Sequence, residues 1–450
     1  MKTWVKPIVM TLLAAVPAVA LTACGASGKE EPDKGKTPSN VPDVTQEKRE
    51  ITFYTPVAYG EETFNLRFGD IVKKKFPNYT INFMDTANGG PVSDMITRGT
   101  SFDIIFTTAG ALEKSIFQYG LEQDLSGLIK SHNVDLSRFD PSFRSILGES
   151  FGGKIYFLPV HADNVVMFYN KAPFDKFNVP YLKDGMTWED IYGVAQKLSR
   201  TDGGVEYIGF NPAPLRYFRM NQLSIPLINP TTLAPTINTD ERWAQFFRKY
   251  AEEFKATIND SKGSFTLDSG KQNDLFFDGR QAMLLSLPFI MTSRADQFKN
   301  IQFGVVSAPV LKDAPKNGFA PYPVNFAITK TSKNKDAAME VLKYLVSDEA
   351  QQYLAKKGFG PVVKSVDVQK ALGADSGAYA SYNWQAVFHT SFAPYTFIGP
   401  YVGDLQTIYE KQFGRVINNE IDINTARRVA EEEAKAKIEE IKKLIPNDLK

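Results

Sequence analysis

Apolar and polar positions alternate over short stretches in the first part of the chain, and helical patterns lie between these stretches. Residues 51–54 and 80–84 have the alternation of half-buried strands, and residues 102–106 form a short run that is apolar apart from Asp103. Residues 62–76 have a helical pattern that ends at Pro77, where proline cannot continue the helix. Strands that alternate with helices predict βα units and a mostly parallel sheet, so the expected fold class is α/β.

Helix signals recur further along the chain. Thr187 and Asp190 have the spacing of a capping box, and an apolar face at helical spacing follows them at Ile191, Val194, Ala195 and Leu198. A second such face runs from Ala338 to Leu345. A final helix is expected from a cap at Asn424 to about Leu444, with Glu–Lys pairs at positions i and i+4: Glu431–Lys435, Glu433–Lys437 and Glu439–Lys443.

The first 24 residues have the pattern of a bacterial export signal. Lys2 and Lys6 precede an apolar run over residues 8–21, which is too short to span a bilayer comfortably. The sequence Leu-Thr-Ala-Cys that ends at Cys24 resembles a lipobox, in which the cysteine is acylated and becomes the first residue of the mature protein. We therefore expect a signal peptide over residues 1–23 and a lipid anchor on Cys24. A plain signal peptide with an incidental cysteine is the alternative.

Composition fits a tethered globular body. Residues 24–47 are small, polar and charged, so they are expected to form a flexible tether between the anchor and the folded part. The 450 residues hold 52 Lys and Arg against 51 Asp and Glu. This balance offers no basic excess for nucleic acid. The length suffices for two domains.

Catalytic motifs are missing from the sequence. The three histidines, His132, His161 and His389, lack the spacing of a zinc site, and there is neither a G-x-S-x-G elbow nor a phosphate-binding loop. We therefore expect no enzyme activity, no metal and no cofactor. A pair of carboxylates of the kind that glycosidases use stays open as an alternative.

Several segments, in order along the chain, resemble the family 1 extracellular solute-binding proteins of ABC importers, the maltose-binding-protein-like family. They are Phe102-Asp103-Ile104-Ile105, Gly153 to Val160, Phe168-Tyr169-Asn170-Lys171, Thr187 to Ile191, Phe277 to Met283, Asn325 to Ile328 with Ser332 to Lys335, and Leu345 to Gln351. Each segment is short, and their joint order and spacing carry the resemblance.

The resemblance implies a two-lobe periplasmic-binding-protein fold of class II. The N-terminal lobe would hold residues 48–161 and 309–360, and the C-terminal lobe residues 164–306 and 362–450. Hinge residues would lie where the chain crosses between the lobes: His161, Asp163, Asn164, Pro309 and Pro361. A ligand would bind between the lobes, beyond the carboxyl ends of the strands.

Candidate ligand-binding residues combine aromatic faces with polar groups, as a sugar site requires. The aromatic candidates are Tyr54, Tyr59, Phe289 and Tyr322, and the resemblance places at Phe289 a cleft tryptophan that stacks on sugar. The polar candidates are Thr107, Thr108, Asn211 and Arg216. Arg216 would suit an acidic sugar because guanidinium binds carboxylate with two hydrogen bonds. Trp384 lies in a stretch, 374–400, that the family pattern does not place.

These features predict a lipid-anchored receptor on the outer face of the cytoplasmic membrane. It would capture a mono- or oligosaccharide as a monomer, close around it by hinge bending, and deliver it to the transmembrane subunits of an ABC permease. A peptide, a polyamine or an anion on the same fold is an alternative cargo. A lipid-anchored carbohydrate-active enzyme and a structural surface lipoprotein are alternatives from other classes.

Overall fold

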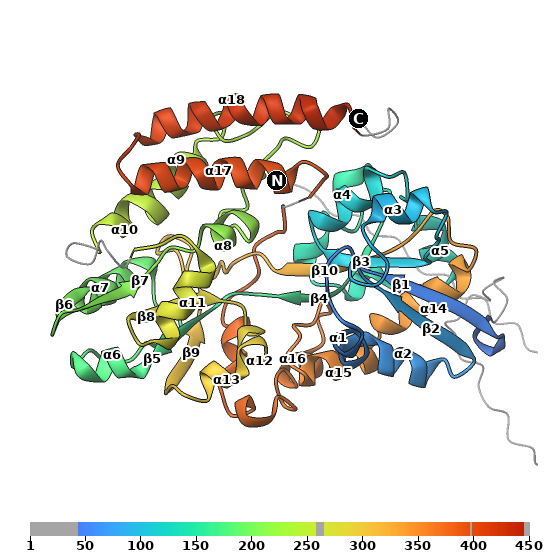
Figure 1. The fold of residues 1–450 in the computed structure, drawn as a ribbon, viewed down its shortest axis with the longest axis horizontal. Helices are drawn as coiled ribbons and strands as arrows, with labels where there is room; N and C mark the ends of the chain where they lie inside the picture. The colour runs from blue at the N-terminus through green and yellow to red at the C-terminus, as the bar shows by residue number, and fades with distance from the viewer. Residues whose placement is uncertain (1–43, 258–264, 397, 445–450) are drawn as a thin grey trace, which may run out of the picture. The chain divides into compact units, whose positions relative to one another are not determined.

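The computed structural model describes residues 44–257, 265–396 and 398–444, which belong to one compact unit (Figure 1). The expected signal peptide, the acylated Cys24 and residues 24–43 of the expected tether lie outside the described residues. Val44–Gln46 forms a short 3-10 turn, η1, in which Val44 is buried. None of the described helices is long and apolar enough to cross a membrane.

Ten described strands form two five-stranded sheets. The first sheet has the order β2-β1-β3-β10-β4 and the second the order β6-β7-β8-β5-β9. The strands of the first sheet are β1 Arg49–Tyr54, β2 Tyr79–Met84, β3 Ile104–Thr108, β4 Leu158–Asp163 and β10 Tyr322–Ile328. Those of the second are β5 Val166–Asn170, β6 Arg200–Asp202, β7 Val205–Phe210, β8 Gln281–Ser286 and β9 Phe303–Ser307.

The expectation of a mostly parallel sheet is wrong. Parallel pairs join β1 to β2 and β3, and β7 to β8, whereas β10 runs antiparallel to β3 and β4, and β5 runs antiparallel to β8 and β9. The reason is the path of the chain. β5 and β10 each enter a sheet directly from the other one, so they start at the edge where the neighbouring strands end.

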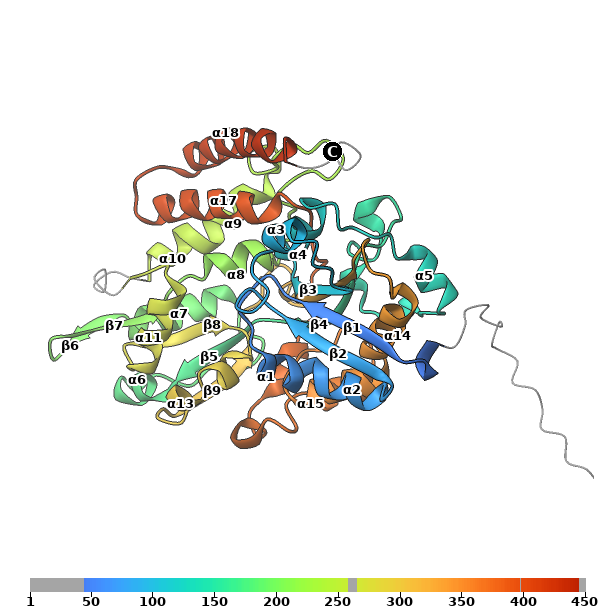
Figure 2. The same cartoon turned by 45° about the vertical axis from the view of Figure 1, so that its right-hand side comes forward.

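Helices surround both sheets, as Figures 1 and 2 show. The chain segments of the first sheet carry α1 Glu61–Phe64, a π-helical turn η2 Asn65–Gly69, α2 Asp70–Lys75, α3 Val92–Thr97, α4 Ala111–Phe117, α5 Ser126–Ser131, α14 Lys335–Leu345 and α15 Asp348–Lys356. The remaining segments carry α6 Lys171–Lys176, α7 Trp188–Leu198, α8 Pro214–Arg219, α9 Arg242–Phe247, the π-helical turn η6 Arg248–Glu252, α10 Glu253–Lys255, α11 Ser269–Phe277, α12 Ile290–Ser293, α13 Ala295–Phe298, α16 Val366–Lys370, α17 Val402–Ile417 and α18 Ile423–Lys442.

Local sequence signals predict the positions of several of these elements. The predicted capping box of α7 is present, with Thr187 accepting from the N–H of Asp190 and the Asp190 carboxylate accepting from the N–H of Thr187. The predicted helix over residues 62–76 is the continuous run α1-η2-α2, which has a π-helical turn at its centre. The strand expected at 102–106 lies two residues later, as β3.

The predicted cap at Asn424 is wrong by two residues. The cap of α18 is Asp422, whose carboxylate accepts from the N–H groups of Asn424 and Thr425. Of the three predicted pairs, only Glu431–Lys435 forms. Glu433 pairs with Lys411 of α17, and Lys437 and Glu439 pair with the nearer residues Glu440 and Lys442. α17 and α18 pack side by side, with α17 also against α8 and α18 against α9 (Figure 1).

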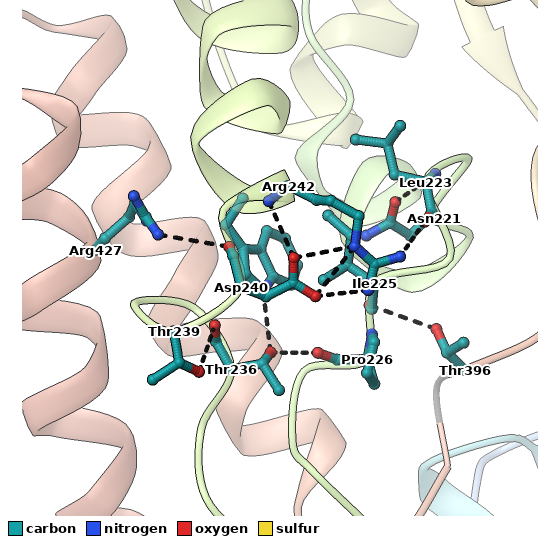
Figure 3. Close-up of polar contacts among 11 residues, drawn as sticks. Asn221, Leu223, Ile225, Pro226, Thr236, Thr239, Asp240, Arg242, Thr396 and Arg427 are labelled. Atoms are coloured by element: carbon teal, nitrogen blue, oxygen red, sulfur yellow. Dashed lines mark hydrogen bonds and ion pairs between the residues drawn. The ribbon is translucent and has the colours of Figure 1, made fainter. Parts of the chain in front are cut away.

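A network of polar contacts fixes the long connection between α8 and α9 (Figure 3). Asp240 binds the guanidinium of Arg242, with an Arg242 Nη2 to Asp240 Oδ2 distance of 2.6 Å. From α18, Arg427 donates to the backbone oxygens of Ile237 and Asn238 and forms an ion pair with Glu241. Arg427 is 4% exposed. It is thus a buried cation whose hydrogen-bond donors are occupied.

Candidate functional site

The two sheets meet at the edges where most of their strands end. Asp163 ends β4 opposite Tyr322, the first residue of β10. Three residues later, Val166 begins β5, opposite Ser286 at the end of β8 and Ser307 at the end of β9. The connection between the sheets is therefore two residues long, and it brings the carboxyl ends of β4, β8 and β9 together. Such edges are where ligands bind in α/β folds.

Eight side chains from different elements gather at this junction and are called the interlobe cluster below. They are Tyr59, Arg67, Asp163, Arg216, Arg219, Phe289, Tyr322 and Phe359. Their elements come from both sheets: Tyr59 and Arg67 follow β1, whereas Phe289 follows β8. A ligand bound here would contact both halves of the molecule.

Arg67 lies at the centre of three aromatic rings. Its Cζ atom is 4.4 Å from the ring centroid of Phe359, 4.8 Å from that of Phe289 and 5.4 Å from that of Tyr59. A guanidinium that stacks on rings uses its flat faces and keeps its N–H edge for hydrogen bonds in the plane. The contact with Phe289 joins the η2 turn beside the first sheet to the start of α12 beside the second.

The loop that carries Tyr59 is held by a buried carboxylate. Asp85 is 3% exposed, and its Oδ2 atom accepts from the backbone N–H groups of Tyr59 and Gly60 at 2.9 Å each. Burial alone would raise the pKa of Asp85, but these bonds and those from the N–H groups of Ala87 and Asn88 lower it overall. Asp85 therefore stays ionised and fixes the backbone of the loop that carries Tyr59.

Asp163 and Arg216 face the junction without direct partners. Within the described part of the chain, no hydrogen bond or ion pair reaches either side chain, and both are partly buried. Burial raises the pKa of Asp163 to about 6, although the positive charges of Arg67 and Arg216 oppose this rise. Burial, with the nearby charge of Arg219, lowers the pKa of Arg216 to about 10, so this guanidinium is still charged at neutral pH.

Arg219 is bonded to neutral groups. It donates from Nη1 to the Tyr322 hydroxyl at 2.9 Å and from Nε to Gln406 Oε1 at 3.1 Å, and its Cζ lies 4.9 Å from the Tyr322 ring centroid. Gln406 in turn donates to Glu410. Burial raises the pKa of Glu410, and Gln406 and Arg219 partly offset the rise.

Five of the predicted residues come together in the interlobe cluster: Tyr59, Asp163, Arg216, Phe289 and Tyr322. Thr107 and Thr108 end β3 at the same edge of the first sheet, where they pair with Asn325 and Val324 of β10. The ligand contacts of all these residues stay predictions.

Three other candidates have partners inside the protein. The Tyr54 hydroxyl donates to the Gly90 oxygen, and Asn211 bonds Gln281 and the N–H of Thr266. Trp384 is 4% exposed, and its indole N–H donates to the Tyr379 oxygen. It packs so closely on Gly373 that a Cβ atom there would lie 2.2 Å from the indole. The polar groups of these three side chains are thus already bonded within the protein, and none of the three belongs to the cluster.

The predicted hinge residues lie on or beside the connections between the sheets. His161 is buried in β4, between the rings of Phe68 and Phe359, and burial with the charge of Arg67 lowers its pKa to about 3.

The other predicted hinge residues have contacts of their own. Asn164 donates to the Phe319 oxygen. The Pro309 oxygen accepts from Gln222. Pro361 is buried. The backbone oxygens of its neighbours Gly360 and Val362 accept from the N–H groups of Ala162 and Asp140, respectively. Hinge motion and the lobe boundaries stay predictions.

The sequence analysis missed Arg67, Arg219 and Phe359. Arg219 had a signal, because it follows Arg216 by three residues and side chains at i and i+3 share a helix face. Arg67 lies in a helical run between apolar residues and has no comparable signal. Its role depends on Phe289 and Phe359, which are more than 200 residues away in the sequence.

A further cavity is lined by none of the eight cluster residues. It has a volume of about 690 Å³ and is lined by residues of 140–149 and 388–396 together with Gln369. The predicted but unplaced stretch 374–400 thus forms one of its walls. Among the described residues, no group of three or more His, Cys, Asp and Glu side chains is placed to hold a metal ion.

Comparison with known proteins identifies the family. The model of the bacterial extracellular solute-binding proteins matches residues 57–352. The chain belongs to this family. A Brucella abortus (strain 2308) relative that is named only as a binding protein is 25% identical over 313 residues, 65% of this chain and 72% of the relative. The predicted family is therefore confirmed, and it is a family of binding proteins.

Solved structures of solute-binding proteins share the fold. An ABC substrate-binding protein from Listeria monocytogenes in complex with cycloalternan has a TM-score of 0.67 at 20% identity, over 87% of this chain and 99% of that one. A sugar transporter protein from Rhizobium etli, in an open conformation, has a TM-score of 0.67 at 19% identity, over 86% and 99%. A solute-binding protein from Thermotoga lettingae with bound α-D-tagatose has a TM-score of 0.63 at 17% identity, over 86% and 99%. The predicted two-lobe fold is confirmed.

Proposed function

We propose that this solute-binding protein captures a saccharide in the interlobe cluster and delivers it to an ABC permease. The observation that carries the proposal is the composition of the cluster. The rings of Phe289 and Tyr59 offer flat apolar faces, and Asp163 and Arg216 next to them have no direct partner. An aromatic face covers the C–H side of a pyranose, and charged groups bind its hydroxyls.

Closure of the two lobes would follow from contacts on both sides of the junction. A ligand that touches Tyr59 near the first sheet and Phe289 near the second binds the closed state better than the open one. The population then shifts toward closure by that difference in affinity. The saccharides bound to the Listeria and Thermotoga proteins of the same fold support this cargo class. We propose neither catalysis nor a cofactor for this site.

A binding screen tests the proposal. The protein without residues 1–23, carrying Cys24→Ser to prevent acylation, is titrated by calorimetry with neutral and acidic saccharides, amino acids, peptides and polyamines. We expect a saccharide to bind, to be recovered unchanged, and to reduce the radius of gyration in solution scattering. Saccharide cleavage would favour the enzyme alternative, and tight binding of only a peptide or polyamine would refute the saccharide cargo.

We propose also that Cys24 anchors the protein to the outer face of the cytoplasmic membrane. It is the single cysteine of the chain and ends the lipobox-like sequence. Two acyl chains give stable anchoring, whereas one binds only marginally. Cys24→Ala should abolish incorporation of labelled fatty acid and release the protein from the membrane fraction. Unchanged labelling of the variant would refute the anchor.

A further inference from the structure

The interlobe cluster holds more positive charge than a neutral solute requires. Three guanidinium groups reach it from two elements: Arg67 from η2, and Arg216 and Arg219 from α8. Asp163 is the carboxylate on which both Arg67 and Arg216 act. Among its eight side chains the cluster thus has three cations and one acid, and Arg219 also acts on Glu410, which lies outside the cluster and is bonded to Gln406.

The three arginines differ in what occupies their donors. Arg219 is bonded to the Tyr322 hydroxyl and to Gln406, and Arg67 is stacked among three rings. Arg216 makes neither a hydrogen bond nor an ion pair with any residue in the described ranges. A partly buried guanidinium has lost much of its hydration, so an unpaired one is costly unless an anion binds to it.

The form of the available groups favours a carboxylate over other anions. Guanidinium presents a planar pair of N–H donors that matches the two oxygens of a carboxylate. A phosphate ester carries close to two negative charges at neutral pH, so the Asp163 carboxylate would repel it more strongly. The ring of Phe289 lies against the neighbouring Arg67 and is partly exposed, so it can also offer apolar surface to the sugar that bears the acid.

From this arrangement we infer that the solute is an acidic saccharide, and that Arg216 binds the carboxylate of a uronic acid residue. The charge of Arg67 adds to the attraction from the side of the first sheet. Arg67 and Arg216 lie on opposite sides of the junction, so one carboxylate between them would draw the two halves together. This inference rests on the proposed saccharide cargo and specifies its class.

The experiment compares acidic and neutral saccharides of equal length. The Cys24→Ser protein without residues 1–23 is titrated with galacturonate and glucuronate monomers and oligomers, with the matching neutral sugars, and with sugar phosphates and sulfates. We expect a uronate to bind roughly 10- to 100-fold more tightly than its neutral counterpart, the range that a charge-assisted pair of hydrogen bonds provides. The affinity should fall as salt is added.

Substitutions of Arg216 test whether this residue causes the preference for a uronate. Arg216→Gln should remove most of the preference for the uronate, and Arg216→Lys should keep part of it, because lysine retains the charge without the planar pair of donors. Arg144→Gln is the matched control, since Arg144 is an exposed arginine that lines the separate 690 Å³ cavity. Melting curves of each variant without ligand verify folding, and Arg216→Lys carries the test if Arg216→Gln does not fold.

The outcomes separate this inference from the function on which it rests. A neutral saccharide that binds as tightly as every uronate overturns the inference and leaves the saccharide receptor standing. Tighter binding of a phosphate or sulfate ester overturns the choice of carboxylate. A uronate preference that survives Arg216→Gln overturns the assignment to Arg216. If no saccharide of either kind binds, both the inference and the proposed function are refuted.

Discussion

Two arginines of the second half of the molecule occupy opposite situations. Arg427 in α18 is 4% exposed and binds the backbone oxygens of Ile237 and Asn238 and the Glu241 carboxylate. Figure 3 shows its further contact with the Asp240 backbone oxygen. Arg216 in α8 is partly buried and has no such partner among the described residues. Burial alone therefore does not show whether an arginine stabilises the fold or binds a ligand. A cation whose donors are occupied holds the fold together, whereas one whose donors are unoccupied is available to a ligand.

The same contrast between a side chain bonded inside the protein and one available to a ligand applies to Trp384 and Phe289. It predicts the largest effects on stability and binding. Trp384→Ala removes a buried ring that fills the space over Gly358 and Gly373, and should cost about 3–5 kcal/mol of stability. Phe289→Ala should cost less than about 1.5 kcal/mol of stability, since its ring is only partly buried, but weaken saccharide binding about 30-fold or more. Urea unfolding and calorimetric titration of both variants measure these effects. A Phe289→Ala protein that binds as tightly as the parent would remove Phe289 from the site.

Substitutions of Arg427 and Arg216 should differ in the same way in their effect on stability, but by a smaller amount. Arg427→Gln leaves the Ile237 and Asn238 oxygens without their donor, and should cost about 3 kcal/mol of stability. Arg216→Gln should leave the stability of the ligand-free protein unchanged or raise it, because it removes a partly buried charge that has no direct partner. Urea unfolding without ligand distinguishes them. Equal losses in the two variants would show that Arg216 has a structural role, and the contrast drawn above would fail.

A buried acid beside the cluster should make stability depend on pH. Glu113 in α4 accepts from the N–H of Gly110, its second oxygen has no partner, and burial raises its pKa from 4.5 to about 8. The folded protein therefore keeps this proton up to about pH 8, whereas the unfolded chain loses it near pH 4.5. Stability should fall as the pH rises between these values.

Between pH 6.5 and 8, Asp163, with a pKa of about 6, is mostly ionised. His132 also titrates there, because burial would lower its pKa but its bonds to Glu340 and Asp336 raise it overall from 6.5, so the comparison with Glu113→Gln isolates the contribution of Glu113. Over this interval the loss from Glu113 is at most about 2 kcal/mol. Melting temperatures of the parent should fall across it, and those of Glu113→Gln should change less. Parallel slopes in the two proteins would show that another group causes the dependence.

The smallest effect is expected from an ion pair that links the two halves at their surface. Lys114 in α4 lies 3.3 Å from Asp404 in α17, and the lysine is exposed. Pairs of this kind contribute about 0–1 kcal/mol and weaken in salt. Asp404→Asn should therefore reduce stability by less than about 1 kcal/mol, and the difference should vanish at about 1 M salt. A larger loss in the variant would mean that this contact helps to hold the halves together.

The sequence by itself determined the features that depend on neighbouring residues. The capping box of Thr187, the apolar face behind it and the strands β1 and β2 follow from local periodicity and hydrogen bonding. The order of short motifs was sufficient to predict the family and the two-lobe fold. Arg216 and Phe289 were found as candidates because each follows a predicted strand or apolar run.

Only the tertiary structure decided which residues meet. The antiparallel directions of β5 and β10 arise because the chain crosses between two sheets, and no local pattern carries that information. Asp422 rather than Asn424 caps α18, since both residues are good caps and the packing of the helix selects one of them. Arg67 meets Phe289 and Phe359 only after the sheets have formed. Whether Arg216 or Arg427 is left without a partner likewise depends on distant backbone oxygens, so it cannot be deduced from the residues beside each arginine.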